Sequence, residues 1–108
     1  MRLAWVTGRL TLSRAVPELK AGSWLICEAL DADALAAEPM RPGQRARPMP
    51  ESLVVYDHFG AGVGDVIAFT EGGEATQPFR PDRVPVDAFC AAIIDSIHIP
   101  QDTAESGN

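Results

Sequence analysis

Glycine and proline are spread through most of the chain, and their distribution limits the regular structure that the sequence can form. The 108 residues include nine prolines and nine glycines. Proline lacks the amide hydrogen that helices and sheet ladders need, and glycine inside a regular element is destabilising. Long amphipathic helices are therefore scarce, and we expect short strands joined by turns.

Four apolar segments rich in β-branched and aromatic residues are predicted to be strands. The first, residues 1–12, contains Gly8, which indicates either two short strands or one bent strand. The others are Ser23–Leu30, Ser52–Tyr56 and Val66–Thr70. Glu71–Glu74 is predicted to be a tight turn, and Thr76–Pro85 a proline-bearing connection.

The segment Val86–Ile99 gives two conflicting signals. Its apolar residues follow a helical spacing, which taken alone favours a helix. Its four isoleucines are β-branched and favour a strand. Nothing within the segment itself resolves the conflict.

The size and charge of the chain exclude several classes of protein. A chain of 108 residues with 46% apolar residues forms one domain with a core, which we place at residues 1–99, followed by a flexible polar tail at 100–108. The net charge of −6 disfavours binding to phosphate backbones. The longest apolar run, Ala88–Ile94, is far too short to cross a membrane, and residues 1–6 do not resemble a signal peptide. We expect Cys27 and Cys90, each inside an apolar run, to be reduced thiols in the core of a cytosolic protein.

Residues 31–50 differ from the rest of the chain. They hold four prolines together with Arg41, Arg45 and Arg47. This composition predicts a partly extended surface loop with a basic tip. A solvated loop is the simpler interpretation, and a contact with a partner is the alternative.

The most distinctive motif is a cluster of glycines, Gly60-Ala61-Gly62-Val63-Gly64. Its spacing differs from that of a dinucleotide-binding fingerprint, and a strand rather than a helix follows it. It also lacks the Lys-Ser/Thr pair of a P-loop. The structural interpretation is that these glycines allow positive φ angles or the close approach of another backbone.

Other catalytic and ligand-binding patterns are weak. His58 and His98 have no partner at a metal-site spacing, and Asp31-Ala32-Asp33 fails the calcium-loop pattern at the following positions. The carboxylate pairs Glu71/Glu74 and Asp57/Asp65 could serve as acid and base, but carboxylates at turns are normally solvated. We therefore expect no enzyme, no cofactor and no metal.

The two tryptophans leave one binding function open. Trp5 and Trp24 could stack bases in a barrel that binds single strands. Because both lie in apolar strands, packing in the core or at a subunit interface is favoured. From the residues alone, the chain is a small β-rich barrel or sandwich of the kind that serves in assembly or binding.

Four segments, taken in order over residues 1–99, resemble the pentameric vertex proteins of bacterial microcompartment shells, the family shared by carboxysomes and ethanolamine-utilisation compartments. They are 1–8, Leu19–Ile26, Asp57–Val66, and Pro85–Ala88 with Ala92–Ile97. The motif residues are Asp57, Gly60, Gly62, Gly64, Asp65, Pro85 and Asp87. Asp65 stands where the family more often has glutamate, and Glu74-Ala75-Thr76 replaces small residues and an arginine.

The resemblance implies a mainly all-β fold, a small OB-like antiparallel β-barrel that assembles as a cyclic pentamer. It also implies a short helical turn near residues 85–89 followed by a strand, against the periodicity of Val86–Ile99. The implied function is structural: pentamers form the vertices that close the polyhedral shell, within the cytoplasm, next to hexameric shell proteins.

Two further hypotheses follow from the resemblance. Gly60, Ala61, Gly62 and Val63 would lie near the fivefold axis and line a narrow pore. Arg41, Arg45 and Arg47 would contact neighbouring shell proteins. The alternative function is a monomeric OB-type barrel that binds single-stranded nucleic acid, and the charge of −6 counts against it.

Overall fold

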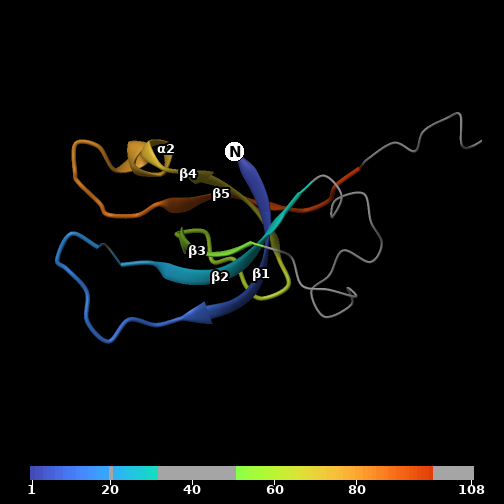
Figure 1. Cartoon of the computed structure of the whole chain (residues 1–108), viewed down its shortest axis with the longest axis horizontal. Helices are drawn as coiled ribbons and strands as arrows, with labels where there is room; N and C mark the ends of the chain where they lie inside the picture. Colours follow the sequence, from blue (N-terminus) through green and yellow to red (C-terminus); the bar gives the residue numbers. More distant parts are fainter. Residues whose placement is uncertain (20, 32–50, 99–108) are drawn as a thin grey trace, which may run out of the picture.

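A computed structural model describes residues 1–19, 21–31 and 51–98, which form a closed barrel of five strands (Figure 1). The strands are β1 (Arg2–Leu10), β2 (Ser23–Leu30), β3 (Ser52–Asp57), β4 (Val66–Glu71) and β5 (Ala88–Ile94). Around the barrel they follow the order β1-β2-β3-β5-β4, and β4 pairs with β1 to close it. The prediction of a small OB-like β-barrel is confirmed. Most of the proline-rich segment 31–50 and the tail 100–108 lie outside the described residues.

The expected antiparallel pairing holds for every pair of neighbouring strands except one. β3 and β5 are parallel, with Tyr56 opposite Phe89. The reason is topological, because strand directions cannot alternate all the way around a closed ring with an odd number of strands. One parallel pair is the least departure from alternation that five strands allow.

β1 is a single bent strand, which resolves the two alternatives left open for residues 1–12. It pairs with β4 through its first half and with β2 along its length. The register with β2 shifts between Val6 and Gly8, as a β-bulge does. A Cβ atom at Gly8 would lie 3.6 Å from the end of the Ile26 side chain, so the neighbouring strand already packs closely there. The bend lets β1 pair with β4 on one side and with β2 on the other, which closes the barrel.

The barrel interior is filled by alternate side chains of all five strands. Cys27 and Cys90 are both fully buried there as free thiols, which confirms the prediction of reduced core cysteines. Burial, reinforced by the nearby charge of Asp57, raises the pKa of each thiol to about 12. Both thiols are therefore protonated and unreactive at neutral pH. The strand residues of this core are Ala4, Val6, Leu25, Cys27, Val55, Ile67, Phe69, Ala88 and Cys90.

Within the segment that gave conflicting signals, Ala88–Ile94 form a strand, as the resemblance implied, but the helical turn predicted near residues 85–89 is not found there. Residues 85–87 are irregular, and β5 begins at Ala88. β5 is hydrogen-bonded to β4 on one side and β3 on the other, which suits its β-branched isoleucines. Apolar residues on both faces of this enclosed strand produced the spacing that resembled a helix.

The short helix lies instead where a tight turn and a connection were predicted. It comprises α2 (Gly73–Thr76) and a 3₁₀ turn, η1 (Gln77–Phe79). Gly72 precedes it with φ of 60°, a conformation that glycine adopts without strain. Ala75 is fully buried, so the helix is held by packing against the barrel wall.

A second apolar cluster, here called the aromatic cluster, lies beneath this helix outside the barrel interior. Tyr56 is its centre, and its ring lies 4.7 Å from that of Trp24 and 5.8 Å from those of Phe79 and Phe89. The Tyr56 hydroxyl donates a hydrogen bond of 2.8 Å to the Ala21 carbonyl. The cluster thereby ties the β1–β2 connection and the segment after β4 to the barrel.

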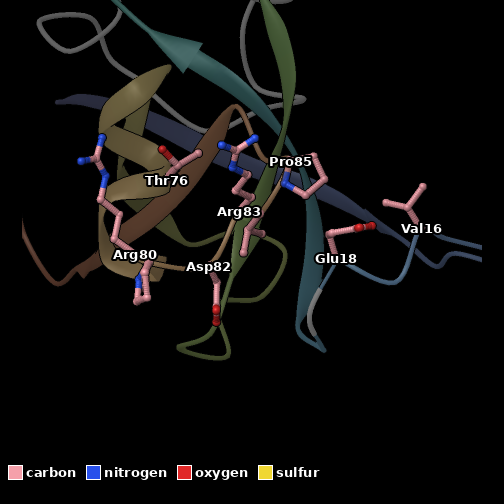
Figure 2. A pocket seen from close by; sticks show the side chains of 9 residues that line it. Val16, Glu18, Thr76, Arg80, Asp82, Arg83 and Pro85 are labelled. Atoms are coloured by element: carbon pink, nitrogen blue, oxygen red, sulfur yellow. The ribbon is translucent and has the colours of Figure 1, made fainter.

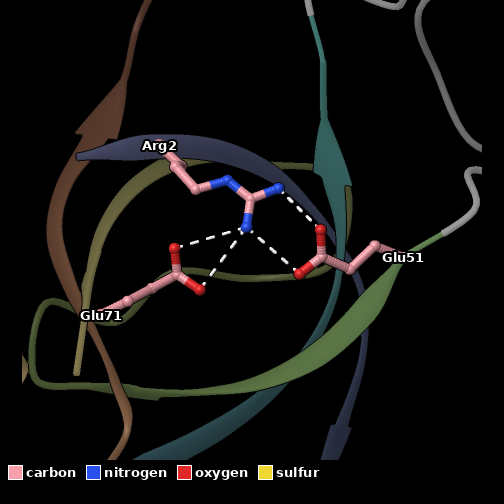
Figure 3. Close-up of polar contacts among 3 residues, drawn as sticks. All are labelled: Arg2, Glu51 and Glu71. Atoms are coloured by element: carbon pink, nitrogen blue, oxygen red, sulfur yellow. Dashed lines mark hydrogen bonds and ion pairs between the residues drawn. The ribbon is translucent and has the colours of Figure 1, made fainter.

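An ion-pair network joins the ends of three strands (Figure 3). Arg2 on β1 contacts Glu51 before β3 at 2.7 Å and Glu71 at the end of β4 at 3.3 Å. The hydrogen bond with Glu51 is the main cause that raises the pKa of Arg2, and the same bond lowers the pKa of Glu51. Because all three side chains are substantially exposed, the network contributes little to stability.

Candidate assembly site: the glycine loop

The glycine motif forms the connection between β3 and β4, residues 58–65, here called the glycine loop (Figure 1). It begins directly after Asp57, the last residue of β3. The loop contains three glycines and has no room for regular structure, so its shape depends on hydrogen bonds to fixed groups.

Asp57 provides most of that support. Its side chain is buried, and its carboxylate accepts backbone hydrogen bonds from Phe59 at 3.0 Å, Gly60 at 2.9 Å and Ala61 at 2.9 Å. Burial by itself raises the pKa of Asp57, but these bonds and one from the Cys90 thiol outweigh it and hold the pKa below 3.8. The carboxylate is therefore charged at neutral pH, with its charge directed at the loop's own amides.

Asp65 anchors the other end of the loop. Its carboxylate accepts a hydrogen bond of 2.8 Å from the Gly62 amide. The backbone of Val6 on β1 exchanges two bonds of 2.9 Å with this end, accepting from Gly64 and donating to Asp65. The indole of Trp5 donates to the Gly64 carbonyl at 3.1 Å. Asp57 and Asp65, the candidate acid and base pair, thus both accept hydrogen bonds from backbone amides of the loop, and their role here is structural.

The three glycines of the loop differ in backbone conformation, so the structure does not require glycine equally at each position. Gly60 and Gly64 have φ angles of 86° and 97°, which side chains rarely adopt. Gly62 is not in that region, and a Cβ atom there would meet nothing closer than the Asp65 carboxylate at 4.0 Å. Nothing in the described part of the chain requires glycine at position 62.

The four residues hypothesised to line a pore do not share one environment. Ala61 is fully buried and belongs to the barrel core, so its side chain cannot line an opening. Gly60, Gly62 and Val63 lie at the loop surface, and 67% of Val63 is exposed. Phe59, which the sequence analysis did not single out, is 58% exposed beside them. A large aromatic residue next to a glycine run was the signal that could have found it.

The remaining predicted positions are separate from the glycine loop. Pro85 and Asp87 are exposed in the segment before β5, where the Asp87 carbonyl accepts a bond of 2.9 Å from the Gly72 amide. Arg41, Arg45 and Arg47 lie outside the described residues.

The described residues contain neither a candidate metal site nor a candidate membrane helix. No group of three or more histidine, cysteine, aspartate and glutamate side chains could hold a metal ion. No helix in this part of the chain has the length and apolar character to cross a membrane. Trp5 is buried, and Trp24 packs in the aromatic cluster, as expected for tryptophans that serve in packing.

Comparisons with known proteins agree with this fold. The chain is 27% identical over 99 residues to the carboxysome shell vertex protein CcmL of Synechococcus elongatus, which covers 92% of the chain and 88% of that protein. The solved structure of CcmL from Gloeobacter violaceus is 26% identical, has a TM-score of 0.71 and covers 92% of the chain and 90% of its own.

A third comparison concerns the fold alone. The pentameric microcompartment shell protein GrpN from Rhodospirillum rubrum is 22% identical, has a TM-score of 0.69, and covers 93% of this chain and 100% of its own.

A family model gives the assignment. The family described as ethanolamine utilisation protein EutN/carboxysome matches residues 1–95. Because the match includes every strand of the barrel and the glycine loop, the chain belongs to the EutN/CcmL family.

Proposed function

We propose that this chain is a structural shell protein that forms pentameric vertices closing the polyhedral shell of a bacterial microcompartment within the cytoplasm. The observation that carries the proposal is the match to this family over the whole barrel. The relatives of the chain include carboxysome shell vertex proteins. The fold is also that of a protein described as a pentameric shell component. Asp57 before the glycine loop and Asp65 at its end hold the loop backbone in shape, which agrees with a structural role rather than with catalysis.

The function is geometric. A flat layer of hexagonal tiles cannot close, and pentagonal tiles introduce the curvature that closure needs. A head-to-tail interface that closes after one-fifth of a turn gives such a tile, and it requires two unlike patches on each subunit. The exposed apolar side chains of this barrel, among them Ile26, Val54, Phe59 and Val63, supply surface for such contacts.

The glycine loop is the part that we place at the fivefold axis. Gly62 has neither a positive φ nor a close neighbour within its own chain, so a contact with other copies would explain a residue without a side chain. Gly60, Gly62 and Val63 would then border a narrow pore, and buried Ala61 would support it from the core. Gly62→Trp is expected to block or disrupt the ring. An unchanged pentamer with an unaltered axial opening in a crystal structure would contradict this placement.

Hexameric shell proteins are the neighbours that a pentagonal vertex would have. We assign Arg41, Arg45 and Arg47 to that contact because a basic tip is unusual in a chain of charge −6. Neutralising all three should leave shells open as tubes or sheets when they are co-expressed and viewed by electron microscopy. Normal closed shells would remove these arginines from the contact.

Binding of single-stranded nucleic acid, the alternative considered from the sequence, has little support. Such barrels stack bases on exposed aromatic residues in a basic groove. Here Tyr56 is buried, and Trp24, Phe79 and Phe89 pack around it. The charge of −6 adds repulsion.

Native mass spectrometry of the purified chain tests the proposal directly. A mass of five chains is expected, and co-expressed shells are expected to close only when the protein is present. A chain that stays monomeric at every concentration, with shells that close equally well in its absence, would overturn the proposal.

A further inference from the structure

An open cleft lies between two arms of the molecule (Figure 2). One arm is the β1–β2 connection, which contributes Val16 and Glu18. The other is the segment between η1 and β5, residues 80–85, here called the cleft arm. Both arms extend from the same side of the barrel, at the left in Figure 1. The loops β1–β2 and β4–β5 are those that OB-folds use to bind ligands.

Packing against the aromatic cluster fixes the position of the cleft arm. Val84 and Val86 are buried in the aromatic cluster, and the Val86 amide donates to the Val84 carbonyl at 2.9 Å. Pro81 and Pro85 have fixed φ angles, which reduces the freedom of the segment further. The arm therefore presents its exposed side chains in a preorganised arrangement, which lowers the entropy cost of binding.

Two arginines of this arm are available to a ligand. Arg80 and Arg83 are exposed, and neither has an ion pair or hydrogen bond through its side chain within the described ranges 1–19, 21–31 and 51–98. Asp82, between them, already has an interaction partner. Figure 2 shows the Glu18 carboxylate directed away from both guanidinium groups, toward Val16. The cleft is therefore basic on one side, and guanidinium groups bind carboxylates with paired hydrogen bonds.

The dimensions and lining indicate which ligand fits. The cleft has a volume of about 1090 Å³ and is open, which suits a segment of chain better than a small metabolite. Its apolar lining consists of Val16, Pro81, Val84 and Pro85, without an aromatic side chain from the described residues on which a base could stack.

The charged residues of the cleft also distinguish it from an interface between the subunits of a pentamer. Permanent interfaces between identical subunits are mostly apolar at their centre. Four of the nine lining residues here are charged: Glu18, Arg80, Asp82 and Arg83. This pattern fits a contact that forms and dissociates with a separate partner.

We propose that this cleft binds an extended acidic segment of another protein, with carboxylates on Arg80 and Arg83 and small apolar side chains against Val16 and the two prolines. The site is separate from the glycine loop and does not depend on the pore.

The probe is a fluorescent octapeptide that alternates glutamate with valine, titrated into the assembled protein and followed by anisotropy at physiological salt. Arg80→Ser/Arg83→Ser is expected to weaken binding about tenfold or more, since hydrogen bonds between charged groups are lost. The control Arg9→Ser/Arg14→Ser changes the net charge equally at two exposed arginines outside the cleft lining, and should bind within about twofold of the wild type.

Several results would overturn the proposal. Equal weakening by both variants would indicate general charge attraction, and the absence of peptide binding would remove the site. Arginine-dependent binding of a short oligothymidine would assign the cleft to nucleic acid. A cleft variant that folds but no longer forms the wild-type ring in native mass spectrometry would make the cleft a subunit interface. A wild-type protein that forms no pentamer would contradict the shell proposal alone, because the peptide titration can still be interpreted.

Discussion

The glycine loop and the cleft arm are both short irregular connections of one barrel, but they place opposite kinds of side chain in solvent. In the glycine loop, backbone amides bond to the buried Asp57 carboxylate at the end of β3, and Phe59 and Val63 are exposed. The cleft arm buries Val84 in the aromatic cluster and exposes Arg80 and Arg83. An apolar rigid surface suits a permanent contact between copies, and a charged one suits an exchangeable contact. If both proposals hold, this small barrel uses one connection for assembly and the other for recruiting a partner.

The largest expected effect comes from removing the support of the glycine loop. Asp57→Ala leaves three loop amides without their acceptor beside the core, and we expect a loss of about 3 kcal/mol or more in the free energy of unfolding. Denaturant unfolding at a fixed protomer concentration measures it, because assembly makes stability depend on concentration. The control is Asp65→Ala, which removes one acceptor and should cost about 1 kcal/mol. Equal losses would show that Asp57 has no special role.

A smaller effect is expected from alanine substitutions in the glycine loop, which distinguish a glycine needed for folding from one needed for assembly. Gly60→Ala places a side chain at a φ of 86° and should cost about 1–2 kcal/mol in unfolding free energy. Gly62→Ala should cost less than about 0.5 kcal/mol, because nothing within 4 Å except the Asp65 carboxylate would meet the new atom. If Gly62→Ala destabilises the chain as much as Gly60→Ala, the monomer itself requires glycine at position 62.

The charge of Asp57 predicts a dependence on acid. The folded pKa lies below the ordinary value of 3.8, so the ionised form stabilises the fold fully above about pH 5. This stabilisation is lost as the pH falls below 3.8 through the folded pKa. Asp57→Asn cannot ionise, so the difference in unfolding free energy between wild type and variant should be constant near neutral pH and shrink in acid. A difference that stays constant down to about pH 2 would contradict the charged carboxylate.

The smallest effect is expected in the cleft arm. Arg80→Ser/Arg83→Ser should change the unfolding free energy by less than about 0.5 kcal/mol per residue, because both side chains are exposed and bond to nothing else in the described structure. Thermal unfolding monitored by circular dichroism measures this. A large loss of stability would mean that these arginines hold the arm together, and the two regions would then differ less than we infer.

The strands could be predicted because their signals are local. The apolar runs of β2, β3 and β4 are bounded by glycine, proline or polar residues, and their predicted limits differ from the observed ones by one residue at most. The Asp57 and Asp65 motif was found in the sequence, but their use as acceptors for loop amides was not, because it depends on where the loop turns back.

Other features could not be predicted because they depend on distant partners. Ala61 looks like a surface residue among glycines, and it is buried because the barrel core lies beneath the loop. The helix at Gly73–Thr76 is too short for a periodic signal, and its buried Ala75 needs the barrel wall. The cleft joins residues 16–18 with 76–85, which no local pattern connects.

The sequence by itself determined the β-rich character, the positions of the strands, the acidic surface and the family, because these follow from composition, alternation and motifs along the chain. The resemblance implied a strand after residue 89, but the tertiary structure alone decided that β5 begins at Ala88 without a helical turn before it, that β3 and β5 run parallel, and which loop residues face solvent. The physical reason is that hydrogen bonding to two neighbours and burial against a core are properties of the closed barrel, and no single segment contains them.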